Sequence, residues 1–467
     1  MKHTPTLIAT ALVALSLPLS AQAAGEAKNV IFFVGDGMGP TTVTAARIYK
    51  YGEAGQLNME KLSRTARIKT FSNDAQTTDS APSMAAYMTG VKMNNEVISM
   101  TADTKAITPT TALTGNCGAN NGKAVETILE LAKGKGKAVG AITTTRITHA
   151  TPAATYSHVC HRDAENDIAV QAVPGGAGYN PALKDGLDVL LGGGKQFFVP
   201  KADGGARPDG RHLVNEMKAA GYTYVETGSA LTAVDGKAVN KLFGLFNKNH
   251  MDYELDRVKK SLDQPSLADM TIKAIDVLSK NPNGYFLMVE GGRIDHALHG
   301  TNAKRVLEDT IAFDDAIKAA LAKVDLSNTL LVFTADHDHT MTINGYSRRG
   351  NPILDISRSY READCTDPKN PKTCKANTDA DGNTYTTLVF GNGPNRKDIR
   401  TTLTSGDTDK SMVLHDDYMQ ETGIRLGSET HGGGDVMLGA GGAGAKGFKG
   451  TLDNTKVFGL LKAAMGL

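Results

Sequence analysis

The chain has 467 residues, 40% of them hydrophobic, which is enough to bury a large core in one large α/β domain or two smaller ones. Its 51 Lys and Arg residues almost balance its 50 Asp and Glu residues, so it lacks the basic footprint of a nucleic-acid-binding protein. The composition therefore argues against both a disordered chain and a nucleic-acid partner.

The first segment has the pattern of an export signal. A basic start precedes an apolar run from Leu7 to Leu19, and Ala21 and Ala23 match the small-residue cleavage pattern. We expect residues 1–23 to be removed, leaving residues 24–467 as a periplasmic or secreted protein. The alternative is a membrane anchor, but a span needs about 18 to 20 apolar residues, and no segment reaches that length.

Short apolar segments alternate with helical patterns along the chain. The predicted strands are residues 29–34, 137–143, 284–290, 329–334 and 386–390, and residues 301–323 are a predicted helix. Strands that are apolar on both faces and alternate with helices favour a large, mostly parallel central sheet with helices on both faces. In such sheets, ligands bind at the carboxyl ends of the strands.

Carboxylate, imidazole, hydroxyl or guanidinium groups follow the ends of four of these strands. In chain order they are Asp36; His149 and Thr151, with Arg162 further on; Glu290, Asp295, His296 and His299; and Asp336, His337, Asp338 and His339; His431 follows later. Carboxylates and imidazoles at one sheet edge would repel or desolvate one another unless cations were bound among them. The pattern predicts a metal cluster, in which Asp and His suit zinc and oxygen ligands suit magnesium.

Residues 76–90, QTTDSAPSMAAYMTG, have the pattern of a helix start. Thr78 or Asp79 can cap the helix, and Pro82 is tolerated in its first turn. This explanation is sufficient for the stretch by itself, and Ser80 as a catalytic nucleophile is the alternative. Ser80 is not in a G-x-S-x-G motif, which leaves metal coordination as the way to activate its hydroxyl.

The four cysteines of an exported chain predict two disulfides. Their spacing favours Cys365 with Cys374 and Cys117 with Cys160, although three pairings are possible. The absence of C-x-x-C pairs from the sequence argues against a cysteine-based zinc site.

Eight motifs together carry a family resemblance: VGDGMG, TDSAPSMAAYMTGVK, TTTRITHATPAATYSHVCHR, VEGGRIDHALHG, TADHDHT, GYSRRG, FGNGP and ETHGGGDV. With these motifs in this order, the chain resembles the alkaline phosphatases over nearly the whole mature sequence. The resemblance implies hydrolysis of small phosphate monoesters through a phosphoserine, with two zinc ions, a third magnesium site and release of inorganic phosphate. It also implies a homodimer.

The resemblance assigns a role to each matching residue. Ser80 would be the nucleophile, and Arg162, oriented by Asp79, would bind two phosphate oxygens. The metal ligands would be Asp295, His299 and His431 for one zinc; Asp36, Asp336 and His337 for the second; and Asp36, Thr151 and Glu290 for magnesium. His149 and His296 stand where some members carry Asp and Lys, and would act around the metal site or phosphate through water, which leaves the third metal open. Asp338 and His339 match no ligand and are expected to be solvated.

Two later segments have unusual compositions. Residues 341–430 are poor in apolar runs and resemble the family's crown region, an insertion over the mouth of the site. The glycine-dense residues 439–450 are expected to form a flexible loop.

The sequence also bears on four other functions. A nucleotide P-loop at residues 186–198 lacks the required Ser or Thr, because Gln196 stands there. A sulfatase would need an arginine where Met84 stands, and Arg162 would crowd the second ester group of a phosphodiester. An exported phosphate- or metal-binding protein would need no nucleophile, so Ser80 is the residue that distinguishes it from an enzyme.

Overall fold

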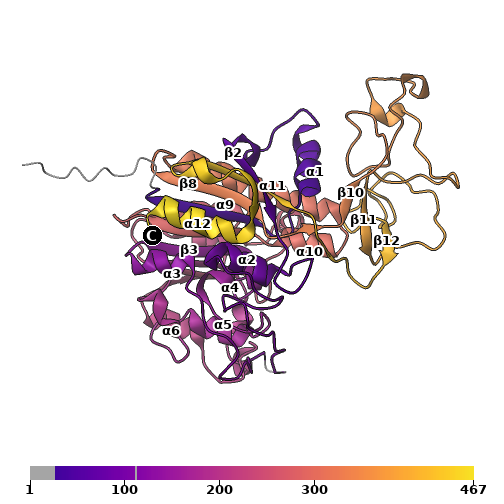
Figure 1. Ribbon diagram of the computed structural model, residues 1–467. Helices are drawn as coiled ribbons and strands as arrows, with labels where there is room; N and C mark the ends of the chain where they lie inside the picture. The colour runs from indigo at the N-terminus through magenta and orange to yellow at the C-terminus, as the bar shows by residue number, and fades with distance from the viewer. Residues whose placement is uncertain (1–26, 111–112) are drawn as a thin grey trace, which may run out of the picture.

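The computed structural model describes residues 27–110 and 113–467. The predicted signal peptide at residues 1–23 lies outside the described residues. Figure 1 shows a layered body built around a sheet, with the segment that carries β10, β11 and β12 projecting from one end. In the described residues, no helix has the length and apolar character that crossing a membrane would require.

Ten of the described strands form the central sheet, in the order β15-β2-β14-β8-β1-β7-β3-β4-β6-β5. Neighbouring strands are parallel except where β14 pairs with β2 and β8, so the predicted, mostly parallel sheet is confirmed. In sheet order, the bounds are Gly450–Asp453, Arg64–Lys69, Val436–Gly442, Thr329–Ala335, Asn29–Gly35, Tyr285–Gly291, Ala138–Arg146, Val189–Gly193, Leu242–Leu245 and Thr223–Val225.

The helices form two packed groups, both of which contact β1. One group contains α1 (Pro40–Tyr51), α8 (Glu254–Lys259), α9 (Leu267–Leu278), α10 (Arg293–His299) and α11 (Ala303–Lys323). The other contains α2 (Ser80–Thr89), α3 (Ile128–Gly134), α4 (Ala150–Tyr156) and α12 (Asn454–Met465). Further short helices are α5 (Glu165–Gln171), α6 (Leu213–Ala219) and α7 (Gly228–Ala233). The helix expected at residues 301–323 is α11.

The innermost strands consist of apolar residues because both of their faces are covered. Every residue of β7 and β8 is buried, as is every residue of β1 after Asn29. The strands predicted at residues 29–34, 137–143, 284–290 and 329–334 correspond to β1, β3, β7 and β8, and all four lie side by side in the central sheet.

The strand predicted at residues 386–390 was placed in the wrong sheet. Its last three residues are the first residues of β11 (Leu388–Gly393). Strand β11 lies between β10 (Met341–Ile343) and β12 (Thr422–Arg425) in a separate three-stranded sheet. Leu388 and Phe390 are buried whereas Val389 between them is only partly buried, as in a strand covered on one face.

The expectation of a flexible loop at residues 439–450 is also wrong for its first part. Residues 439–442 complete β14, which pairs with β2 on one side and β8 on the other. Gly439 lies so close to the Phe333 ring that a Cβ atom would stand 2.1 Å from Phe333 Cε1. The glycines here permit close packing of an aromatic side chain in the sheet.

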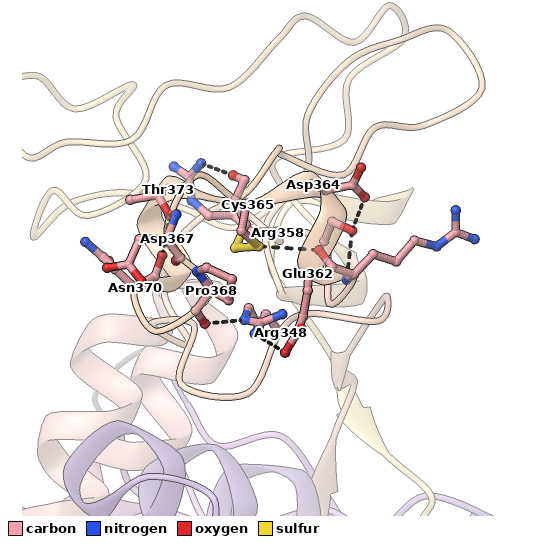
Figure 2. Close-up of a disulfide and its surroundings, with 12 residues drawn as sticks. Arg348, Arg358, Glu362, Asp364, Cys365, Asp367, Pro368, Asn370 and Thr373 are labelled. Carbon is pink, nitrogen blue, oxygen red and sulfur yellow. Dashed lines mark hydrogen bonds and ion pairs between the residues drawn. A yellow bond between two sulfur atoms is a disulfide. The ribbon is translucent and has the colours of Figure 1, made fainter.

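Both predicted disulfides are confirmed: Cys117 pairs with Cys160, and Cys365 with Cys374. Figure 2 shows the second disulfide inside an irregular segment held largely by side-chain contacts with the backbone. Arg348 Nε donates to the Pro368 carbonyl oxygen at 3.0 Å, and Arg358 Nη1 donates to the Cys374 carbonyl oxygen at 3.1 Å. The disulfide and these bonds stabilise a region with little regular structure.

Candidate active site

The strand register brings the predicted site residues to one edge of the sheet. Strand β1 lies between β7 and β8, with Gly35 opposite both Gly291 and Ala335. Asp36 and Asp336 therefore follow adjacent strand ends, and Glu290 lies beside them on β7. Parallel strands with polar residues at their carboxyl ends thus create one dense polar site.

Ser80 lies at the N-terminus of α2, where Asp79 caps the helix by accepting a hydrogen bond from the Ala81 amide. Ser80 is 2% exposed, and its Oγ atom lies 3.1 Å from His337 Nε2 and 3.5 Å from Asp36 Oδ1. The structure therefore brings Ser80 together with predicted metal ligands.

The first turns of α2 are attached to the end of β8. Ser83 Oγ donates to the Asp336 carbonyl oxygen at 2.6 Å, and the Tyr87 hydroxyl donates to the Ala335 carbonyl oxygen at 2.8 Å. These bonds fix the position of Ser80 relative to Asp336.

Asp36, Asp336 and His337 form a fully buried group whose ligand atoms lie within 4.8 Å of one another. His337 Nε2 lies 3.3 Å from Asp36 Oδ1 and 3.4 Å from Asp336 Oδ2. Among the described residues, Asp336 Oδ2 has no hydrogen-bond partner. Burial raises the pKa of both carboxyl groups to about 7 and lowers the pKa of His337 to about 3. Buried carboxylates beside a neutral imidazole, with an unpaired oxygen, fit a divalent cation.

Asp295, His299, His339 and His431 form a second group. Asp295 and His299 are four residues apart on α10, so they lie on the same helix face, and His431 Nε2 lies 3.2 Å from His299 Nε2. The Nδ1 atoms of His299 and His431 face the carbonyl oxygens of Glu429 and Thr78, at 2.6 and 2.9 Å. Donation from Nδ1 leaves the Nε2 lone pairs free, which is the tautomer that a metal ligand requires.

His339 is not solvated, contrary to the sequence-based expectation, because it lies inside this second group. It is 4% exposed, and its ring nitrogens face Asp295 and Glu429. Asp338 is half-buried and accepts a hydrogen bond from the His339 amide. The sequence indications that could have placed these two residues at the site were their motifs: His339 is the second histidine of ADHDHT, and Glu429 is the glutamate of SETHGGGD.

Asp36, His149 and Glu290 form a third group with ligand atoms within 4.8 Å. Glu290 Oε2 accepts hydrogen bonds from Thr143 and Thr145, whereas Glu290 Oε1 and His149 Nδ1 are buried and have no hydrogen-bond partner in the part of the chain that the structure describes. Burial and the charge of Asp36 hold the pKa of Glu290 well above its usual value. Thr151 Oγ1 lies 3.4 Å from Asp36 Oδ2, so the predicted third-site residues also converge.

The Arg162 guanidinium lies between Asp79 and His149. Its Nη1 pairs with Asp79 Oδ1, and its Nη2 lies 2.9 Å from His149 Nε2. The side chain is 14% exposed. An arginine held in this way presents its planar fork in a fixed direction, as bidentate phosphate binding requires.

His296 lies in a cluster of imidazoles that the sequence did not reveal. The rings of His149, His250 and His296 make edge contacts, with 4.3 Å between the centroids of His250 and His296. His296 Nδ1 lies 2.8 Å from Arg293 Nη1. His250 follows β6 across a short loop, and nothing in its sequence context pointed to the site.

A buried serine at a helix start, surrounded by carboxylate and imidazole clusters at the carboxyl edge of an α/β sheet, defines a metal-binding hydrolase. The family model for alkaline phosphatase matches residues 27–467. The chain therefore belongs to the alkaline phosphatase family and is a phosphoric monoester hydrolase.

Individual relatives agree with this family. The tissue-nonspecific alkaline phosphatase isozyme of Rattus norvegicus is 37% identical over 444 residues, which cover 88% of this chain and 78% of the rat protein. The crystal structure of Thermus thermophilus alkaline phosphatase has a TM-score of 0.68 and 26% identity, covering 98% of this chain and 96% of the other. A mutant of TAB5 alkaline phosphatase, solved with magnesium bound, shares the fold with a TM-score of 0.64, 23% identity, and coverage of 95% and 99%.

Proposed function

We propose that the chain hydrolyses phosphate monoesters through a phosphoserine at Ser80, with two zinc ions and a third site occupied by magnesium. The observation that carries this proposal is the position of Ser80 Oγ, 3.1 Å from His337 Nε2 and 3.5 Å from Asp36 Oδ1. A serine hydroxyl is a weak nucleophile, and proximity to metal ligands is what would activate it.

Each metal site would use one set of the residues described above. Asp295, His299 and His431 would hold one zinc; Asp36, Asp336 and His337 the second; and Asp36, Thr151 and Glu290 the magnesium. When bound, the ions would promote deprotonation of the serine hydroxyl and stabilise negative charge on the attacking and leaving oxygens. The third metal is supported by the oxygen ligands of Glu290 and Thr151 and by the magnesium of the TAB5 mutant.

The protein's own groups would bind and orient the substrate. The Ser80 oxygen forms a bond to phosphorus while the ester P–O bond breaks, and the leaving oxygen takes a proton to become an alcohol. Water then displaces Ser80 and releases inorganic phosphate. Arg162 would bind two phosphate oxygens, with Asp79 and His149 fixing its direction. Because the phosphate is the recognised group, we expect broad specificity among small monoesters.

His149 and His296 would act around this site without holding zinc themselves. His149 would position Arg162 and border the third site, since its Nε2 faces Arg162 and it lies with Asp36 and Glu290. His296 would affect the site indirectly, through its contacts with Arg293 and the His250 ring. Both histidines are neutral at neutral and alkaline pH, since burial lowers the pKa of His149 well below its usual value and that of His296 to about 3.

The proposal also covers the cellular location, the domain organisation and the oligomeric state of the protein. The two disulfides support export to an oxidising compartment, periplasmic or extracellular, after removal of residues 1–23. Residues 24–467 would form one catalytic domain, with residues 341–430 as a crown-like insertion; the separate sheet of β10, β11 and β12 supports this division. We further propose a homodimer, on the basis of the family resemblance.

A Ser80→Ala variant tests the mechanism. Its activity on p-nitrophenyl phosphate should fall at least about a thousandfold while its metal content, measured by mass spectrometry, stays the same. The matched control is Ser279→Ala, at the exposed end of α9, which should retain full activity. Near-normal turnover by the metal-loaded Ser80→Ala variant would refute the proposal, as would full activity after exhaustive chelation. Phosphodiester and sulfate-ester assays distinguish the rival hydrolase activities.

A further inference from the structure

The turn formed by residues 94–97 carries an acidic residue in a backbone conformation that favours glycine. The Val97 amide donates to the Asn94 carbonyl oxygen at 3.2 Å, so Glu96 occupies the third position of a β-turn. The φ angle of Glu96 is 70°, in the left-handed region that glycine adopts most readily. A bulky residue held in such a conformation beside an active site is a reason to look for a function.

The same turn connects the segments that carry Ser80 and Arg162. The Glu96 amide donates to Asp79 Oδ2 at 3.1 Å, and Asn95 Oδ1 accepts from the Asp79 amide at 3.1 Å. On its other side, the Glu96 carbonyl oxygen accepts from the Arg162 amide at 2.8 Å. The backbone of Glu96 is therefore fixed between the cap of the nucleophile's helix and the phosphate-binding arginine.

The Glu96 carboxyl group has charged neighbours but no direct partner. Burial raises the pKa of Glu96 to about 7, with Asp79 and Asp163 adding to the shift and Arg162 and His431 opposing it. Within the described part of the chain, the Glu96 side chain forms neither a hydrogen bond nor an ion pair. The carboxylate thus adds negative charge near the site without stabilising a particular contact.

We propose that the Glu96 carboxylate weakens the binding of inorganic phosphate at Arg162 and so speeds product release. This inference rests on the proposed function, in which Arg162 binds phosphate oxygens. Asp79 already neutralises part of the guanidinium charge. Glu96, whose backbone contacts both Asp79 and Arg162, adds a second carboxylate whose charge acts on this pair and lowers the positive potential that bound phosphate meets. The product keeps the dianionic group by which the substrate is recognised, so an enzyme of this kind must avoid holding the product too tightly. Glu96 is therefore a positioning residue that acts through the electrostatics of Arg162.

Two substitutions separate the charge of Glu96 from its backbone strain. Glu96→Gln keeps the size and the turn but removes the charge, and Glu96→Gly also relieves the left-handed conformation. At about pH 9, where the carboxyl group is ionised, both variants should lower the inhibition constant for inorganic phosphate about threefold to tenfold. KM should fall with it, and kcat should fall as product release slows. An unchanged or higher inhibition constant in Glu96→Gln would overturn the proposal.

Control variants test the role of Glu96 separately from the proposed phosphate-binding role of Arg162. Ser261→Gly relieves a similar φ of 49° in a remote turn, and Glu362→Gln removes one charge from an 80% exposed side chain; neither should change the inhibition constant. Arg162→Ala should raise it strongly. If Arg162→Ala has no effect, the proposed role of Arg162 fails. If Arg162→Ala weakens phosphate binding but Glu96→Gln leaves it unchanged, only the inference about Glu96 fails.

Discussion

His339 and Glu429 form a buried ion pair, in which the histidine Nδ1 lies 2.5 Å from the glutamate Oε2. The other ring nitrogen of His339 lies 2.8 Å from Asp295 Oδ1. Burial opposes the charged form, but the hydrogen bonds with Asp295 and Glu429 raise the pKa of His339 to about 10. His339 therefore fixes the orientation of a predicted zinc ligand.

Replacing His339 should weaken metal binding without removing a predicted ligand. His339→Asn shortens the side chain and breaks the contact with Asp295, and the loss of an outer partner of a metal ligand lowers affinity about 10- to 100-fold. Competition with a chelator, followed by metal analysis, measures this change. His212→Asn, at the start of α6, is the remote control. Unchanged metal retention by His339→Asn would contradict the prediction.

Metal removal should make stability strongly dependent on pH. Without cations, burial raises the pKa of Asp36 and Asp336 from the usual 3.8 to about 7. A raised carboxyl pKa means that the folded state binds more protons than the unfolded state, so the contribution of these two groups to stability is largest at low pH and is lost as pH rises through this window. The unfolding midpoint of chelated protein should therefore fall by about 5–10 °C between pH 4 and 7 relative to metal-loaded protein. Scanning calorimetry at matched heating rates tests this; parallel curves for both forms would refute it.

The centre of the molecule could be predicted from the sequence because two patterns are local: the apolar runs that form the strands, and the polar residues that directly follow them. Continuous apolar runs identified β1, β3, β7 and β8, and their register alone brings Asp36 and Asp336 to adjacent strand ends. His250 could not be predicted, since its proximity to His149 and His296 depends on a loop conformation. Glu96 was missed for the same reason, because no periodic pattern identifies its turn.

Strand β14 was not predicted because its high glycine content is typical of a loop. Gly439 lies opposite Phe333 in the register of β14 and β8, so the glycine leaves room for the aromatic ring. A single sequence does not show which residues face each other on neighbouring strands. Composition alone therefore favoured flexibility where the structure has a strand in the interior of the sheet.

This packing predicts a position-specific cost of adding one methyl group. In Gly439→Ala, the new Cβ would stand 2.1 Å from Phe333 Cε1, so the buried ring or the strand must move. We expect a loss of about 1–3 kcal/mol in the free energy of unfolding, as for other overpacked cores. Gly427→Ala is the matched control, because its added Cβ would have no atom within 4 Å from the described residues other than its own chain neighbours. Denaturant unfolding compares the two, and equal stabilities would show that the sheet tolerates the methyl group. Phe333→Leu should partly restore the stability of Gly439→Ala.

The two disulfides should differ in their effects on stability and activity. Cys117 and Cys160 are 43 residues apart, whereas Cys365 and Cys374 are 9 apart. Loop-closure entropy therefore predicts losses of about 4 and about 2.5 kcal/mol when each pair is replaced by serine.

The effect on activity depends on what each disulfide holds. Cys160 precedes Arg162 by two residues, so loss of the first bridge should let Arg162, the proposed phosphate-binding residue, move. KM and the inhibition constant for phosphate should rise in Cys117→Ser/Cys160→Ser. Cys365→Ser/Cys374→Ser should retain near-normal kcat and KM, because its bridge closes a loop in the separate segment of residues 341–430 (Figure 2). Steady-state kinetics and limited proteolysis of both variants test this, and the second variant should be cleaved faster within residues 341–430. A larger loss of activity from the second variant than from the first would show that this segment, rather than the Cys117–Cys160 bridge, controls phosphate binding.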